Sequence, residues 1–305
     1  MPKVAIVIVN WNSGLQIRDC VESIDQHGEG LGISTVVVDN GSTDGSADSV
    51  ASLSGVKVVR SGSNLGFARA CNLGASFISD ADYLLFLNPD AMLAAGVLQR
   101  AVEFMEAPSS STIGICGVAL LEESGRVARS CARFPTPLRL ALIATGIDRI
   151  FPSFGTTMTE WDHAQSQIVD QVIGAFFLVR RALFVHLKGF DERFFVYFEE
   201  VDFAFRARHY GAKSIFLADV KAFHRGGGTS GQVKPARLFY SLRSRILYAR
   251  KHFSRMGYLL VVATTFGLEP VSRSVNHLVR GQFVGVRETL FAYRMLFEWA
   301  VGVEK

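Results

Sequence analysis

Four short runs of β-branched and other apolar residues constrain the fold of this 305-residue chain more than any other feature. Polar or glycine-rich residues follow each run, and the runs lie at residues 4–9, 35–39, Val56–Arg60 and Tyr83–Leu87. Runs without polar alternation are typical of strands that are covered on both faces. Helix-like stretches separate them, at residues 15–24, 47–53, 67–78 and 95–105. This alternation predicts a doubly wound α/β sheet with helices on both faces and right-handed crossovers.

The residues that directly follow the predicted strands are the first candidates for a ligand site, because such sheets bind ligands beyond the carboxyl ends of their strands. They read Asn10-Trp11-Asn12 after the first run, Asp39 to Asp44 after the second, and Asn88-Pro89-Asp90 after the fourth. All three loops are rich in carboxylates or amides. No GxGxxG follows the first strand and the chain contains no GxxxxGKS or GxxxxGKT, so a dinucleotide oxidoreductase or a P-loop NTPase is disfavoured.

The pattern changes beyond residue 130. Residues 135–168 contain three prolines and little periodicity, which predicts a loop region. Periodic order returns with a predicted strand at 172–179, a helix at 201–210 and a strand at 214–217. The four cysteines have no CxxC or CxxH spacing, which favours buried reduced thiols over a zinc site or a disulfide framework. They are Cys20, Cys71, Cys116 and Cys131.

The formal net charge of +4 is an average over two unlike parts. Residues 1–220 carry 18 Lys and Arg against 24 Asp and Glu, whereas residues 221–305 carry 14 against 4. A basic tail on an acidic body predicts contact with something anionic. The longest uncharged apolar stretch of the tail, Met256 to Leu268, has thirteen residues, short of the roughly 20 that span a bilayer as a helix. The N-terminal apolar run is too short for a signal peptide, so a cytoplasmic location is expected.

Two helices are predicted in this tail, each with apolar residues at steps of three and four. Arginines fall mostly on the other side of the first stripe. This design is typical of a helix that lies in a membrane interface. Packing of the stripes on the body of the protein or in a homodimer is an equal alternative, and a nucleic-acid partner is a weaker one. The stripes are Leu238, Leu242, Ile246, Ala249, Phe253 and Met256, then Phe283, Val286, Leu290, Tyr293, Phe297 and Ala300.

Carboxylates in the predicted loops could hold a ligand or shape the backbone. Asp90 could bind a divalent cation together with a substrate phosphate, or it could form a turn before the next helix. Asp39 could bind a nucleobase or ribose, and it could equally be a turn residue. The segment around Asn64 and Gly66 could pass its backbone close to a phosphate, or it could simply start a helix.

Acidic residues also crowd the start of the helix predicted at 201–210. Asp202 has Arg206 four residues on, a spacing that predicts a structural ion pair. Glu200 has no local cation and is flanked by aromatic residues, which favours it as a general base because such surroundings raise proton affinity. His224 and Arg225 precede a glycine run and could reach a metal or a diphosphate.

Seven ordered motifs between residues 3 and 230 together resemble the inverting glycosyltransferases of family 2, which have the GT-A fold. The bacterial rhamnosyltransferase-like members are the most similar in pattern. The motifs are VIVNWN (7–12), VVDNGSTDGS (37–46), NLGFARACNLG (64–74), LLFLNPDA (84–91), GAFFLVRR (174–181), GFDERFFVYFEEVDFAFRARHYGAK (189–213) and HRGGGTS (224–230). The resemblance implies a GT-A domain over residues 1–230 and a basic helical extension over 231–305.

The resemblance also implies a pocket for the nucleotide sugar. Asp39 matches the aspartate that contacts the base, and Asn10 lies in the loop that lines the same pocket. Asn64 and Gly66 fall in the NLGFARACNLG motif and are expected near the donor. Asn88 stands where the family's DxD motif has its first acidic residue, so we expect it to contact the donor and not to ligate metal. Arg225 is expected to pair with the diphosphate.

The resemblance also implies which residues hold the metal and which residue is the base. Asp90 matches the last carboxylate of the DxD motif, which holds Mg²⁺ or Mn²⁺ on the diphosphate, and His224 matches a histidine that touches the metal or diphosphate in some relatives. Glu200 matches the base of the family's Glu-Asp motif. Because glutamate replaces the usual aspartate there, Glu200 and Asp202 both remain candidates for the base.

The reaction implied is the transfer of a sugar, with L-rhamnose from dTDP-rhamnose favoured, to a hydroxyl of a lipid-linked saccharide in cell-surface polysaccharide synthesis. A UDP-sugar donor is an alternative, and so is a nucleotide-sugar-binding protein without catalysis. A lipid-linked acceptor implies a peripheral location on the inner face of the cell membrane, reached through the C-terminal helices.

Overall fold

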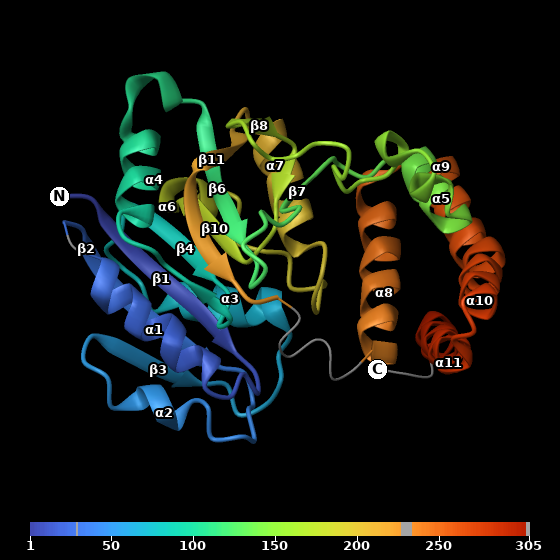
Figure 1. The fold of residues 1–305 in the computed structure, drawn as a ribbon, viewed down its shortest axis with the longest axis horizontal. Coiled ribbons are helices and arrows are strands. Elements are labelled where there is room, and N and C mark those ends of the chain that lie inside the picture. The colour runs from blue at the N-terminus through green and yellow to red at the C-terminus, as the bar shows by residue number, and fades with distance from the viewer. Residues whose placement is uncertain (29, 227–233, 303–305) are drawn as a thin grey trace. The chain divides into compact units, whose positions relative to one another are not determined.

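A computed structural model describes residues 1–28, 30–226 and 234–302 (Figure 1). The chain forms two compact units. The first comprises Met1–Ala132, Trp161–Phe195 and Glu199–Thr229, and the second comprises Arg133–Glu160, Val196–Phe198 and Ser230–Lys305. The division of the chain at residue 230 into two domains stays a prediction.

A mixed sheet of nine strands organises the described part of the first unit. Its order is β3-β2-β1-β4-β10-β6-β11-β5, and β8 pairs with β11 outside this path. The first four strands are parallel, as the apolar runs predict, whereas β10 is antiparallel to both neighbours. The bounds are β1 Lys3–Asn10, β2 Gly32–Asp39, β3 Val56–Arg60, β4 Tyr83–Leu87, β5 Ala91–Met92, β6 Ile113–Leu121, β8 Gln167–Val169, β10 Phe176–Arg180 and β11 Lys213–His224.

Helices cover both faces of this sheet. Successive residues of each strand point to opposite faces, so one strand packs against helices on both sides. Ile6 and Ile8 of β1 belong to one buried cluster with residues of α1 and α4. On the other face, Gly74 of α3 lies so close to β1 that a Cβ there would come within 2.5 Å of Val7 Cγ1. The helices of this unit are α1 Gln16–His27, α2 Asp48–Ala51, α3 Phe67–Ser76, α4 Val97–Glu106, α6 Arg181–His186 and α7 Glu199–His209. The predicted α/β fold is confirmed.

Helices make up most of the described part of the second unit, and one of them lies where a loop was predicted. The helix α5, Pro137–Thr145, forms within residues 135–168 because its ends are well capped. The Thr136 side chain accepts a hydrogen bond from the Arg139 amide, proline occupies the first turn, and Gly146 ends the helix in the left-handed conformation. The remainder of the segment contains short turns and β8, beside the small pair β7 Cys131–Ala132 and β9 Gln171–Val172.

The C-terminal helices of this unit are α8 Lys234–His252, α9 Arg255–Ala263, the π-helical turn η5 Thr264–Leu268, α10 Glu269–Val279 and α11 Phe283–Ala300. Much of the first predicted stripe packs inside the unit. Leu242 and Ile246 of α8 are buried against Ala292 and Leu296 of α11 in one cluster. Internal packing therefore accounts for this part of the stripe.

Two further predictions concern thiols and membrane spans. All four cysteines are free and buried, as predicted. Burial raises the pKa of Cys71 well above its ordinary value, as it does for the other three thiols. Among residues 1–28, 30–226 and 234–302, no helix combines the length and apolar character needed to cross a bilayer.

Candidate active site

The loops after β1 and β2 are joined by the side chain of Asn10. Its amide nitrogen donates to the hydroxyls of Ser42, at 3.1 Å, and Ser46, at 2.9 Å. Its amide oxygen accepts a hydrogen bond from Ser13, and Asn10 is fully buried. With both ends of its amide engaged, Asn10 fixes the shape of the two loops. Its direct contact with a donor stays a prediction.

Asp39 ends β2 beside Asn10 and is almost fully buried. One carboxylate oxygen accepts the Ser42 amide at 3.2 Å, and the other lies 3.4 Å from Arg60 Nη1. Arg60 ends β3, is about half exposed, and also pairs with Asp48 at 2.5 Å. Arg60 is not among the site residues predicted from the sequence, although it ends a predicted strand and therefore lies at the same edge of the sheet.

Asn64 and Gly66 organise the loop before α3. The Asn64 side-chain oxygen accepts hydrogen bonds from the Asn40 amide group and the Gly66 backbone, both at 3.0 Å. Gly66 has a φ of +83°, and a Cβ there would lie 2.3 Å from the carbonyl oxygen of Phe195. That carbonyl also accepts the Phe67 amide at 2.6 Å. A close approach of protein backbone therefore explains this glycine, and contact with a phosphate stays a prediction.

Substituting Gly66 by alanine should destabilise the protein by about 2–4 kcal/mol, because strained backbone and overpacking against Phe195 add together. Urea denaturation of the two proteins measures the loss. Gly62→Ala is the matched control, since Gly62 has a similar φ of +78° with nothing within 4 Å of a Cβ. The control should lose only about 1–2 kcal/mol. Equal losses at both positions would show that the contact with Phe195 contributes nothing.

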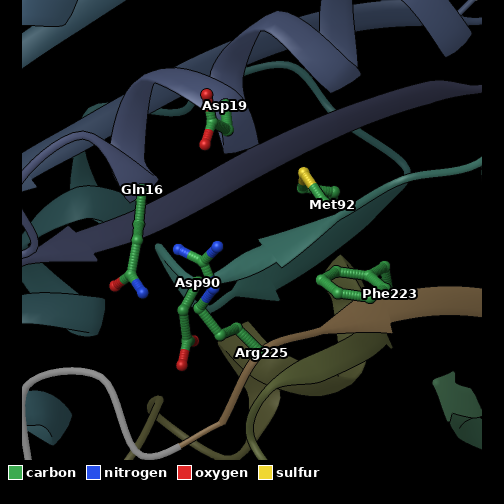
Figure 2. A pocket seen from close by; sticks show the side chains of 6 residues that line it. All are labelled: Gln16, Asp19, Asp90, Met92, Phe223 and Arg225. Carbon is green, nitrogen blue, oxygen red and sulfur yellow. The ribbon is translucent and has the colours of Figure 1, made fainter. Parts of the chain in front are cut away.

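Asp90 and His224 meet where the short strand β5 pairs with the end of β11. His224 Nε2 lies 3.2 Å from Asp90 Oδ1, and both side chains are mostly buried. The Arg225 backbone amide donates to the Asp90 carbonyl at 3.0 Å. Figure 2 shows the adjoining pocket, which is lined by Gln16, Asp19, Asp90, Met92, Phe223 and Arg225. The Arg225 guanidinium pairs with Glu123 at 2.6 Å and is about half exposed.

The Asp90 carboxylate is held in its charged form. Burial by itself raises the pKa of Asp90, but hydrogen bonding and charge from His224, together with backbone amides, lower it below the ordinary value. Within the described ranges, no three Asp, Glu, His or Cys side chains converge on a possible metal position. One carboxylate and one imidazole fit a cation whose remaining ligands are substrate phosphates and water. The geometry therefore suits a metal ion that takes its remaining ligands from the donor.

A strained turn presents the second group of candidates. Tyr197 and Phe198 both have positive φ, 66° and 70°, directly before α7 begins at Glu199. Consecutive bulky residues in this region are unfavourable and persist where the surroundings impose them, often at functional sites. The turn places Glu199 and Glu200 in the first turn of α7. Each has one carboxylate oxygen that is buried and makes no hydrogen bond in the structure.

These two carboxyls have raised proton affinity, whereas Asp202 is committed to an ion pair. Burial raises the pKa of Glu200 to about 6, against the lowering effect of the amides of Glu200 and Val201. Burial and the neighbouring Glu200 charge raise the pKa of Glu199 well above its ordinary value. Asp202 is fully buried and binds Arg206 Nε at 2.7 Å. Arg206 also donates to the carbonyls of Leu187 and Gly189.

The predicted site residues therefore form separate groups within the first unit. Asn10 and Asp39 end the neighbouring parallel strands β1 and β2, and Asn88 directly follows β4, where its backbone amide donates to the Ala175 carbonyl at 3.0 Å. Asp90 and His224 make a second group, and Glu200 and Asp202 lie on α7. Residues 227–230 of the HRGGGTS motif lie outside the described residues. Glu199 is not among the predicted site residues, because the sequence does not distinguish its burial from that of Glu200.

Comparison with solved structures supports the α/β fold described above. The chain is similar, over its whole length and 81% of the other chain, to the structure of the mannosyltransferase PcManGT from Pyrobaculum calidifontis with GDP-Man and Mn²⁺, with a TM-score of 0.57 and 16% identity. At that identity the likeness concerns the fold alone, which is the mixed α/β architecture of a sugar transferase.

Sequence comparison defines the family. The model of glycosyl transferase family 2 matches residues 5–187, more than half of the chain, and the chain belongs to this family. It is 25% identical to the N-acetylglucosaminyl-diphospho-decaprenol L-rhamnosyltransferase of Mycobacterium tuberculosis over 74% of this chain and 77% of the relative. It is 27% identical to the rhamnosyltransferase WbbL of Escherichia coli K12 over 54% of this chain and 61% of the relative. The predicted resemblance to family 2 is confirmed.

Proposed function

We propose that the protein transfers L-rhamnose from dTDP-rhamnose to a hydroxyl group of a lipid-linked saccharide, with inversion at the anomeric carbon. The observation that carries the chemistry is the buried Glu200 carboxylate oxygen, which has no hydrogen-bond partner in the structure and belongs to a group with a pKa of about 6. A general base needs a free acceptor and a proton affinity near the working pH. Two rhamnosyltransferases among the relatives support the sugar.

Glu200 accepts the proton of the acceptor hydroxyl as that oxygen attacks the anomeric carbon. The bond to the nucleoside diphosphate breaks on the opposite side, and the single displacement inverts the configuration. Asp202 holds Arg206, whose guanidinium ties α7 to the carbonyls of Leu187 and Gly189, and Asp202 takes no proton in this scheme. The choice of Glu200 as base thus rests on the difference between a carboxylate with one unbonded oxygen and a carboxylate held in an ion pair.

The donor occupies the carboxyl edge of the parallel strands, with its base near Asp39 and its diphosphate near Asp90 and Arg225. Asp90 and His224 would hold Mg²⁺ or Mn²⁺, and a bound ion would neutralise charge on the diphosphate leaving group. Arg225 adds a donor for the same oxygens by exchanging Glu123 for phosphate. Such fixed charges act without reorganisation when the leaving group becomes negative.

The acceptor places the protein at a membrane. The Mycobacterium tuberculosis relative is named for an acceptor on decaprenol diphosphate, which is a lipid. We infer a peripheral location on the inner face of the cell membrane, with the basic C-terminal helices as the contact.

The direct test offers a panel of nucleotide sugars to the purified chain with Mg²⁺ or Mn²⁺ and a lipid-linked saccharide. Release of nucleoside diphosphate and a longer lipid-linked product are expected with dTDP-rhamnose. Turnover only with a UDP-sugar would assign a different donor to the same site. Donor binding without either product would mean a nucleotide-sugar-binding protein and would refute the proposal of catalysis.

A further inference from the structure

The helical segment from α9 through η5 to α10 exposes a set of apolar side chains. On α10, Val271, Val275 and Val279 recur at steps of four and Leu278 lies three residues after Val275, so the four share a face. They are between 49% and 82% exposed. On α9, Met256 and Leu260 are 75% and 42% exposed and are also four residues apart. These six residues define what we call the outer face of the segment.

The opposite side of α10 is polar and faces the interior of the second unit. Glu269 is almost fully buried, where it binds Arg245 of α8 and, at 2.7 Å, Arg273 of its own helix. The Ser272 hydroxyl donates to the Ala144 carbonyl of α5 at 2.6 Å. His277 lies against Gly285 of α11 and 3.1 Å from the Gln282 side chain. This arrangement is the reverse of a helix that packs its apolar stripe inward.

Apart from Glu269, the charged residues between the start of α9 and the start of α11 are all arginines. Between Arg255 and Arg287, the only acidic residue of the sequence is Glu269, and its charge is already paired inside the unit. Arg255, at the start of α9, and Arg280, directly after α10, are exposed. The apolar outer face is therefore flanked at both ends by cations that have no carboxylate of the segment to pair with.

We propose that the outer face of α9 and α10 is the surface that inserts into the interface of an anionic membrane. Its valines and leucines enter the boundary between headgroups and acyl chains, while Arg255 and Arg280 bind lipid phosphates. A second copy of the chain is a poorer occupant, because two such faces would bring the arginines of both segments together and the one acidic residue of each segment is already paired inside its unit. Of the two stripes predicted as the membrane contact, the first has its central residues buried on α8, so the proposal does not include it. Phe283, Leu290 and Phe297 of the second stripe are exposed on α11, and the contact through that stripe stays a prediction.

Sedimentation of the full chain with vesicles of phosphatidylcholine and phosphatidylglycerol in equal amounts tests this surface. Val271→Glu combined with Val279→Glu should weaken vesicle binding at least about tenfold, because both valines must leave water to bind. Val185→Glu is the matched control, since Val185 is a comparably exposed helical valine in α6 of the first unit, and it should bind like the parent. Circular dichroism checks that the variants are folded.

The electrostatic part has its own test. Arg255→Gln and Arg280→Gln should each weaken binding to the anionic vesicles by about fivefold and reduce its salt dependence. Parent protein that fails to bind vesicles, or a double valine variant that binds as well as the control, overturns the proposal. A parent dimer that the double valine substitution converts to monomers, with no vesicle binding by either, would assign the face to a second copy. The assay contains neither donor nor acceptor, so its outcome is independent of the proposed reaction.

Discussion

Glu200→Gln is expected to lower the turnover of sugar transfer by about 10²–10⁴-fold, the contribution typical of a positioned general base. Glutamine preserves the shape of the side chain but cannot take the proton of the acceptor hydroxyl. The KM for the donor should change little, because the donor pocket is formed by other elements. Steady-state kinetics with saturating acceptor measures both quantities.

The pH dependence gives this prediction a second readout. With a pKa of about 6, Glu200 is protonated and inactive at low pH, so kcat/KM of the parent should rise through pH 6 and level off above it. A raised carboxyl pKa also means that the folded state holds a proton more tightly than the unfolded state. Stability therefore falls as the pH rises from about 4.5, the ordinary carboxyl pKa, to about 6, and stays at the lower value above that, so Glu200→Gln should raise the Tm at pH 8.

Asp202→Asn provides the control, because Asp202 is the other carboxylate that the motif offers as base. Loss of its charge leaves Arg206 without its ion-pair partner inside the protein, so the free energy of unfolding should fall by about 3–5 kcal/mol. Turnover by the folded fraction should fall far less than in Glu200→Gln. The opposite pattern, an inactive but fully stable Asp202→Asn beside an active Glu200→Gln, would assign the base to Asp202.

The fold of the first unit could be predicted because its strands are written as continuous apolar runs. Residues 4–9 and Tyr83–Leu87 are buried on both faces, so each position reports the same environment and the period is clear. Residues 135–168 could not be read in this way. The helix α5 within them is specified by Thr136, Pro137 and Gly146 at its ends, and its short apolar sequence has no clear period.

In the site, contacts between residues close in sequence were predictable, and contacts between distant segments were not. The engagement of Asp202 by Arg206 follows from a spacing of four residues and was predictable. The close contact between Gly66 and Phe195, and the contact between Arg60 and Asp39, join segments that are distant in sequence. A glycine or an arginine in a loop has several common roles, so neither Gly66 nor Arg60 indicates its contact from the sequence. The exposure of the apolar face of α10 was equally hidden, because an amphipathic pattern does not say which face turns inward.

Asp90→Asn is expected to lower kcat/KM for the donor by about 10²–10³-fold, the range seen when one group that stabilises transition-state charge is removed. His224 keeps the Asp90 pKa below its ordinary value, so the carboxylate is charged throughout the neutral range and the amide removes a full negative charge. Titration of Mn²⁺ in the presence of nucleoside diphosphate should show weaker metal binding. Unlike Glu200→Gln, the variant should keep the rise of kcat/KM through pH 6.

Asp19 makes this experiment specific, because Asp19 and Asp90 line the same pocket (Figure 2). Asp19 is exposed on α1, whereas Asp90 is mostly buried beside His224. If the pocket attracts the metal only by its overall negative charge, Asp19→Asn and Asp90→Asn will weaken Mn²⁺ binding alike. If the Asp90–His224 pair is the binding group, Asp19→Asn will stay within about threefold of the parent, as expected for one screened surface charge. Parent-like Mn²⁺ affinity in Asp90→Asn would remove Asp90 from the metal site altogether.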